Sequence, residues 1–283
     1  MKFDPQAMDR AYNPRLVVPN AADIVARWTA SSRTVRLAEP CYLDIACGDA
    51  PGQNLDIFPA RSQRGPAPLL VFIHGGYWRG LDKSDFSFVA PAFTRAGAAV
   101  AVINYRLVPK VSLEDLVRDV LMAVTWCYLH SGQYGADPQR IVVAGHSAGG
   151  HLTAMMLACQ WPRWHGALPA NVVKGGLAVS GLYDLEPLMH APFLNVDIGL
   201  TPARLPFLSP AWMPPATHAP LVTAVGGDEN EGFHVQNDLI KRRWAHVLRR
   251  DVPMPGHDHF SICDALVTAG TPLHAAALEL LGL

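Results

Sequence analysis

Short apolar runs alternate with segments of helical periodicity along most of the chain. The runs are wholly or mainly apolar, and they cover residues 69–73, 98–103, 141–144, 172–179 and 221–225. Such runs are typical of strands that are buried on both faces of a sheet. Residues 113–129 carry apolar side chains at helical spacing instead. The alternation predicts an α/β fold, with a mostly parallel, doubly wound sheet and helices on both faces.

The first part of the chain has weaker patterns. Apolar side chains at helical spacing predict one amphipathic helix over residues 21–30, within a lead-in that extends to about residue 32. Two antiparallel edge strands are expected next, around Val35 and over residues 55–58. A polar stretch with proline and glycine then predicts a surface loop over residues 61–68.

The regular alternation breaks down in a proline-rich stretch over about residues 182–219, which still carries aromatic and apolar side chains. A connection of this length inside a domain is usually functional, and its apolar content predicts a small cap over the strand ends. After it we expect a helix over residues 233–248, a loop over 251–256 and a helix from residue 262 onward. Without a linker, residues 1–283 are expected to form a single domain.

Composition narrows the classes of partner and compartment. Half of the residues are hydrophobic, 17% are charged and the formal net charge is −1, so nucleic acid and anionic membrane surfaces are not expected partners. The five cysteines are scattered without a C-x-x-C pair, which favours reduced thiols over a disulfide framework. Neither a signal peptide nor a run of membrane-spanning length is apparent. A soluble, cytoplasmic protein is therefore expected.

A serine bracketed by glycines follows the third apolar run. The sequence Gly145-His146-Ser147-Ala148-Gly149 matches the pattern G-x-S-x-G, and helical periodicity resumes directly after it. In that pattern a tight turn from strand to helix holds the serine in a strained conformation with its hydroxyl exposed, and small neighbours let the chain pass. The strand before and the helix after favour a nucleophile at Ser147 over a chance glycine-rich turn.

A serine hydroxyl is a good nucleophile only when a histidine takes its proton, and an acid must orient that histidine. In a fold of this type the chain order is serine, acid, histidine. The apolar run at 221–225 leads into Gly226-Gly227-Asp228-Glu229, so the acid is Asp228 or Glu229. A loop near the C-terminus holds His257 and His259, and spacing alone does not choose between them.

Acyl transfer also needs donors for the oxygen that becomes negative in the tetrahedral intermediate. His74-Gly75-Gly76-Tyr77 follows a buried strand and fits the oxyanion loop of esterases and lipases, although an ordinary glycine turn would have the same sequence. The expected donors are the backbone amides of Gly76, Tyr77 and Ala148.

Several motifs together resemble the kynurenine formamidase (arylformamidase) group of α/β-hydrolases. The similarity spans nearly the whole chain, and it is carried by residues 74–78, 145–152, 180–187, 208–210 and 258–260. Tyr77-Trp78 after His-Gly-Gly is the most specific part, because general esterases of this fold usually have a third glycine there. The resemblance implies hydrolysis of an N-formyl aromatic amide, with Ser147 as nucleophile and His259 as general base. It favours Glu229 as the acid, with Asp228 as the alternative if one residue is inserted.

An aromatic leaving group needs an apolar pocket, for which Tyr77, Trp78 and Tyr183 are the expected substrate-binding residues, although each could equally pack in the core. A carboxylesterase with the same acyl-serine chemistry remains the alternative function. No cofactor or metal is implied. A metal-dependent hydrolase using His257 and His259 would leave Ser147 unexplained, and a non-enzymatic protein would be expected to lack a triad member. The expected partner is a small-molecule amide or ester, and a homodimer is left open.

Overall fold

One eight-stranded sheet forms the centre of the molecule, which a computed structural model describes for residues 3–61 and 65–283. The strand order is β1-β2-β4-β3-β5-β6-β7-β8. The pairs β1–β2 and β2–β4 are antiparallel, and the remaining neighbours are parallel. The strands are β1 Tyr42–Ala46, β2 Asn54–Phe58, β3 Ala67–Ile73, β4 Ala99–Ile103, β5 Ala136–His146, β6 Val173–Val179, β7 Leu221–Gly226 and β8 Leu248–Met254. The expected α/β-hydrolase type of sheet is thereby confirmed.

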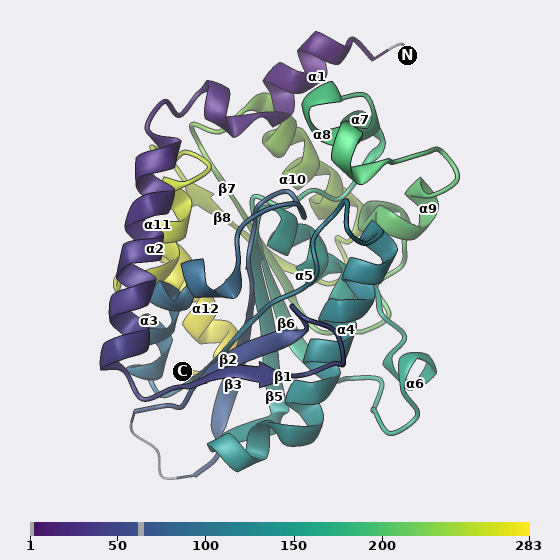
Figure 1. The fold of residues 1–283 in the computed structure, drawn as a ribbon. Coiled ribbons are helices and arrows are strands. Elements are labelled where there is room, and N and C mark those ends of the chain that lie inside the picture. Colours follow the sequence, from purple (N-terminus) through teal and green to yellow (C-terminus); the bar gives the residue numbers. More distant parts are fainter. Residues whose placement is uncertain (1–2, 62–64) are drawn as a thin grey trace.

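Helices cover both faces of the sheet (Figure 1). One face packs against α2 Ala21–Ala38, α3 Ala90–Thr94, α11 Ser261–Val267 and α12 Pro272–Leu281. The other packs against α4 Leu113–His130, α5 Ala148–Ala158 and α10 Glu231–Arg243. The shorter helices are α1 Pro5–Tyr12, α6 Trp161–Trp164, α7 Glu186–Met189, α8 Pro192–Ile198 and α9 Leu205–Leu208, and the 3₁₀ turns are η1 Pro14–Leu16, η2 Lys83–Asp85, η3 Ser87–Val89, η4 Ser131–Tyr134 and η5 Pro210–Trp212.

The central strands consist of apolar residues because helices cover both faces of the sheet and exclude water from them. Every residue of β3 and β4 is buried. Val71 of β3 lies between Ala101 of β4 and Val143 of β5. Burial of one valine- or leucine-sized side chain contributes about 1.5–3 kcal/mol, so these strands make the core that orders the loops at their ends.

The parallel strands β3, β5, β6 and β7 all end at the same edge of the sheet. Loops that follow parallel strands meet at this edge, which is where open α/β sheets bind ligands. The cap helices α7, α8 and α9 lie near this edge, and α1 packs beside α7, α8 and α10 (Figure 1). The N-terminal segment and the cap therefore both lie close to the loops after β3, β5, β6 and β7.

Several secondary-structure expectations differ from the structure. Val35 belongs to α2, which continues to Ala38. Residues 55–58 form part of β2 as expected, but β2 pairs with both β1 and β4, so β1 and not β2 lies at this edge of the sheet. Residues 251–254, expected in a loop, belong to β8, which pairs with β7. The helix expected over 233–248 ends at Arg243, and the C-terminal helix is divided into α11 and α12. Of the surface loop expected over 61–68, residues 62–64 lie outside the described part of the chain, and residues 67–68 already belong to β3.

Over the described ranges, no helix combines the length and apolar character that a membrane crossing requires.

Candidate active site

Ser147 lies in the tight turn between β5 and α5 with backbone angles φ 58° and ψ −116°. The turn is possible only because the residues two positions before and after Ser147 are glycines. A Cβ atom on Gly145 would lie 2.3 Å from the carbonyl oxygen of Gly149, and one on Gly149 would lie 2.0 Å from the carbonyl oxygen of Ile73. The Ser147 amide donates to the Val179 carbonyl of the next strand at 2.8 Å, which fixes the strained residue.

His259 connects Ser147 to a carboxylate. Its Nε2 atom lies 3.0 Å from Ser147 Oγ, and its Nδ1 atom lies 2.6 Å from Glu229 Oε2. A carboxylate oxygen accepts, so Nδ1 carries the proton and Nε2 is left to accept from the serine hydroxyl. All three side chains are buried. The arrangement can draw the proton from Ser147 when its oxygen attacks an acyl carbon.

Glu229 is held in place by its second oxygen. Oε1 accepts from the Gly226 amide at 2.7 Å and from Ser180 Oγ at 2.6 Å. Asp228 is exposed, and the structure does not bring it to His259. Ser180, which directly follows β6, was not predicted as a site residue, although it opens one of the motifs that carry the family resemblance.

His257 is directed away from this group. Its Nδ1 atom lies 3.1 Å from the Pro255 carbonyl, and the ring is partly exposed. The structure thus brings His259 to Ser147 and leaves His257 on the loop. Over residues 3–61 and 65–283, no cluster of three or more His, Cys, Asp or Glu side chains is arranged to hold a metal ion.

The loop after β3, residues 74–80, is called the oxyanion loop here after the role expected of it. It turns three successive residues into the left-handed region, with φ values of 110° at Gly76, 49° at Tyr77 and 59° at Trp78. The amides of Arg79 and Gly80 both donate to the Gly76 carbonyl at 3.1 Å, which closes the turn. Within the part of the chain that the structure describes, the Gly76, Tyr77 and Ala148 amides donate to no protein acceptor. These amides are therefore available to a developing oxyanion.

A pocket of about 460 Å³ opens onto Ser147 and His259. Its walls come from the oxyanion loop, the cap and the N-terminal segment. The aromatic side chains in its lining are Trp28, Tyr77, Phe86, Phe193 and Phe260. Tyr77 and an aromatic side chain of the cap, here Phe193, were expected in the pocket. Trp28 and Phe86 were not, because their segments have no local signature of a binding site. The pocket can bind a substrate with an aromatic group.

Comparisons with known proteins support a hydrolase. The family described as BD-FAE matches residues 55–162. Kynurenine formamidase from Danio rerio is 28% identical over 96% of this chain and 92% of its own, and that from Salmo salar is 29% identical over 85% and 82%. A crystal structure from a Silicibacter species, provisionally described as a thioesterase, is 30% identical with a TM-score of 0.83, covering 95% of this chain and 97% of its own. The chain belongs to the α/β-hydrolase superfamily. Its expected resemblance to kynurenine formamidases is confirmed.

Two predicted substrate-binding residues of this α/β-hydrolase lie in the core, which corrects the expectation. Trp78 is fully buried, and its Nε1 donates to His151 Nδ1 at 3.2 Å. His151 Nε2 in turn donates to the Leu208 carbonyl at 2.8 Å, and burial lowers the pKa of His151 to about 4. Tyr183 is also fully buried, below the glycine turn after β6. Trp78 thus joins the oxyanion loop to α5 and the cap instead of lining the pocket.

His146, the residue before the nucleophile, lines the pocket beside His259. Its Nε2 atom lies 2.7 Å from the His259 carbonyl, which can only accept, so Nε2 carries the proton. Burial lowers the pKa of His146 well below its ordinary value, and the neighbouring His259 lowers it further. The His146 ring is therefore neutral, and it supports the loop that carries His259.

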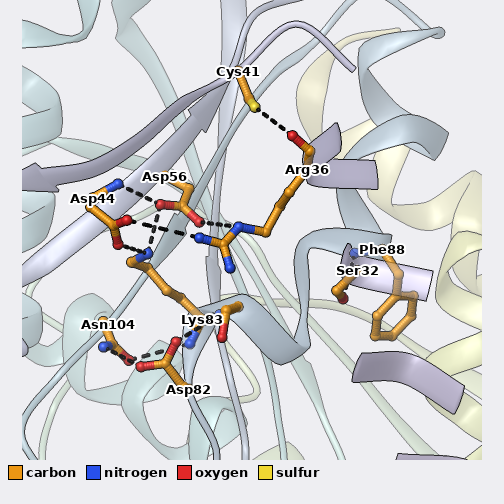
Figure 2. A network of polar contacts seen from close by, with 10 residues as sticks. Ser32, Arg36, Cys41, Asp44, Asp56, Asp82, Lys83, Phe88 and Asn104 are labelled. Carbon is orange, nitrogen blue, oxygen red and sulfur yellow. Dashed lines mark hydrogen bonds and ion pairs between the residues drawn. The ribbon is translucent and has the colours of Figure 1, made fainter. Parts of the chain in front are cut away.

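A network of polar contacts surrounds Lys83, which follows the oxyanion loop in the chain (Figure 2). Lys83 is 2% exposed, and its Nζ atom lies 2.6 Å from Asp56 Oδ1 and 2.7 Å from Asp44 Oδ1. Asn104 accepts from the Lys83 amide at 3.3 Å and donates to Asp82 at 2.8 Å. The network joins the segment after the oxyanion loop to β1, β2 and the end of β4.

Asn104 also reaches the start of the loop. Its Oδ1 atom lies 3.2 Å from His74 Nε2, and the His74 ring stacks on Tyr105 with centroids 4.2 Å apart. Burial lowers the pKa of His74, so this ring is neutral near pH 7. The buried Asn104 side chain thus contacts both ends of the segment from His74 to Lys83.

Proposed function

We propose that this α/β-hydrolase is a serine hydrolase that removes the formyl group from an N-formyl aromatic amide such as N-formylkynurenine. The observation that carries the proposal is the buried series Ser147–His259–Glu229, with separations of 3.0 Å and 2.6 Å, at the base of an aromatic pocket. The names of the zebrafish and salmon relatives support the formamide as substrate.

In the first half of the reaction, Ser147 Oγ attacks the formyl carbon while His259 Nε2 takes its proton. The carbonyl oxygen becomes negative, and the amides of Gly76, Tyr77 and Ala148 stabilise it. Glu229 stabilises the positive charge that forms on His259. Collapse of the intermediate breaks the carbon–nitrogen bond, and His259 returns its proton to the aromatic amine, which leaves.

In the second half, a water molecule attacks the formyl-serine ester. His259 takes a proton from that water, the same three amides hold the oxyanion, and collapse breaks the ester bond. The proton returns to Ser147 Oγ, and formate is released. No cofactor takes part in either half.

The test is the rate of hydrolysis of N-formyl-L-kynurenine and of p-nitrophenyl acetate by the wild type and by Ser147→Ala. We expect a higher kcat/KM for the formamide, and a loss of about four orders of magnitude or more in the variant, because removal of the nucleophile leaves only binding and oxyanion stabilisation. Circular dichroism of the variant checks that it is folded. Substantial turnover by folded Ser147→Ala would contradict the serine mechanism.

A carboxylesterase is the second candidate function, and the provisional description of the Silicibacter relative as a thioesterase favours it. An ester or thioester would use the same nucleophile, base and oxyanion donors. Efficient ester hydrolysis that depends on Ser147, with negligible cleavage of formylkynurenine, would support this alternative and overturn the formamide as substrate.

A further inference from the structure

The charges that line the pocket are of one sign. Arg15 and Arg79 are in its lining, and no aspartate or glutamate of the described residues accompanies them. Glu229 lies behind His259 and is absent from the pocket walls. A pocket with unmatched positive charge favours a substrate that carries negative charge.

Arg79 already has an acidic partner. Its Nη1 atom donates to Asp197 and, at 2.7 Å, to the Phe193 carbonyl, and its guanidinium lies 5.7 Å from the Phe193 ring centroid. These contacts tie the oxyanion loop to α8 of the cap. The charge of Arg79 is therefore largely compensated inside the protein.

Arg15 has no such partner. Within residues 3–61 and 65–283, its guanidinium makes no ion pair and no hydrogen bond, although the residue lines the pocket. The side chain is exposed, so water solvates it while the pocket is empty. Among the described residues that line the pocket, Arg15 is therefore the arginine that remains available to a ligand.

The backbone that carries Arg15 is held by the two loops that form the active site. Asn230, the neighbour of Glu229, donates from Nδ2 to the Arg10 carbonyl at 2.7 Å and to the Asn13 carbonyl at 3.3 Å. Tyr77 Oη of the oxyanion loop donates to the Tyr12 carbonyl. Asn13 Oδ1 then accepts from the Arg15 amide at 3.2 Å and caps η1. The position of Arg15 is thus coupled to the loops of the acid and the oxyanion donors.

We propose that Arg15 binds a carboxylate on the leaving-group side of the substrate, so that the preferred substrates are N-formyl arylamines with a carboxylate group in the side chain. This inference rests on the proposed function for the identity of the bond that is cleaved. The aromatic walls hold the ring, and the guanidinium offers paired N–H donors that match the two carboxylate oxygens. The carboxylate does not change charge during the reaction, so Arg15 contributes to substrate binding, and its loss raises KM more than it lowers kcat.

The test compares N-formyl-L-kynurenine with its α-carboxamide, which lacks the negative charge, in the wild type, Arg15→Gln, Arg15→Lys and Arg10→Gln. In Arg15→Gln we expect the KM for the carboxylate to rise at least about tenfold more than the KM for the carboxamide, with partial recovery in Arg15→Lys. Arg10 is the matched control, because it is an exposed arginine on the same segment outside the pocket. Arg10→Gln should retain the wild-type preference for the carboxylate.

Ionic strength gives a second readout that a purely structural role would not change. In the wild type the KM for the carboxylate substrate should rise with salt, and this dependence should be lost in Arg15→Gln. Equal effects of Arg15→Gln on both substrates, or the same effect from Arg10→Gln, would overturn the proposal.

The carboxylate subsite formed by Arg15 and the proposed function can each fail, and the two failures give different results. Cleavage of both formamides that depends on Ser147, without preference for the carboxylate, overturns the subsite alone. If neither formamide is cleaved but esters are, the formamide assignment is wrong, and 3-acetoxybenzoate and 3-acetoxybenzamide replace the two substrates. A carboxylate preference that is lost in Arg15→Gln with this ester pair would still support the subsite, and its absence would overturn it.

Discussion

The two carboxylate oxygens of Glu229 accept hydrogen bonds from different partners. One oxygen accepts from His259, and the other accepts from the Gly226 amide and Ser180 Oγ. The second pair of bonds fixes the rotation of the carboxylate, so the first bond can hold the imidazole in a single tautomer. Ser180 therefore supports the Glu229 carboxylate, and its own backbone lies in the left-handed region with φ 51°.

We predict that Glu229→Gln lowers kcat about 10³- to 10⁴-fold, because a neutral amide no longer stabilises the charged His259 or specifies its tautomer. Asp228→Asn is the matched control, since Asp228 is the adjacent residue and its side chain is exposed. It should change kcat by less than about threefold. Steady-state kinetics of both variants is the measurement, and a larger fall in Asp228→Asn would mean that the acid is wrongly assigned.

At the scale of elements, the segment from β3 to α3 depends on an ion pair whose acidic partner lies outside the segment. Lys83 of η2 pairs with Asp56 of β2, and both are buried. Asp44 of β1 contacts the same Lys83 Nζ atom, but its side chain is 63% exposed. Removing one partner of a buried pair leaves a buried charge uncompensated, whereas water replaces an exposed partner.

These contacts predict different losses of stability when either aspartate is replaced by asparagine. Asp56→Asn should lower the free energy of unfolding by about 3 kcal/mol or more, and Asp44→Asn by less than about 1 kcal/mol. Urea unfolding of both variants, with unchanged m-values, is the measurement. Equal losses would show that burial does not decide the strength of this network.

At the scale of the whole molecule, three buried histidines make stability depend on pH. Burial lowers the pKa of His74, His146 and His151, the last to about 4. Unfolding returns each ring to its ordinary pKa of about 6.5, so between these values the unfolded chain binds more protons than the native protein. Stability is therefore greatest above the unfolded pKa and falls as the pH decreases toward the folded pKa.

We predict that the free energy of unfolding decreases from pH 7 to pH 5, with a contribution of about 2 kcal/mol from His151 alone. Urea unfolding at pH 7, 6 and 5 measures the slope. His151→Gln should reduce this slope, and His165→Gln, which changes an exposed ring, should leave it unaltered. A slope that His151→Gln leaves unchanged would be inconsistent with a neutral, buried His151.

The sequence by itself determined the features that depend on local pattern. Uninterrupted apolar runs predicted the central strands, because only strands covered on both faces have this composition. Glycines at 145 and 149 predicted the turn at Ser147, because no other residue fits the close contacts there. β8 was missed because it is an edge strand with Arg249, Arg250 and Pro253 in its sequence, and pairing on one side requires no apolar run.

Only the tertiary structure decided which side chains meet. Local spacing could not choose between Asp228 and Glu229, because the choice depends on how the loops after β6, β7 and β8 approach one another. It could not tell that Trp78 and Tyr183 lie in the core, or that Trp28 and Arg15 of the N-terminal segment line the pocket. Each of these outcomes is set by packing between elements distant in the chain. A periodic pattern indicates whether a residue is buried, but it does not indicate which side chains that residue contacts in the folded protein.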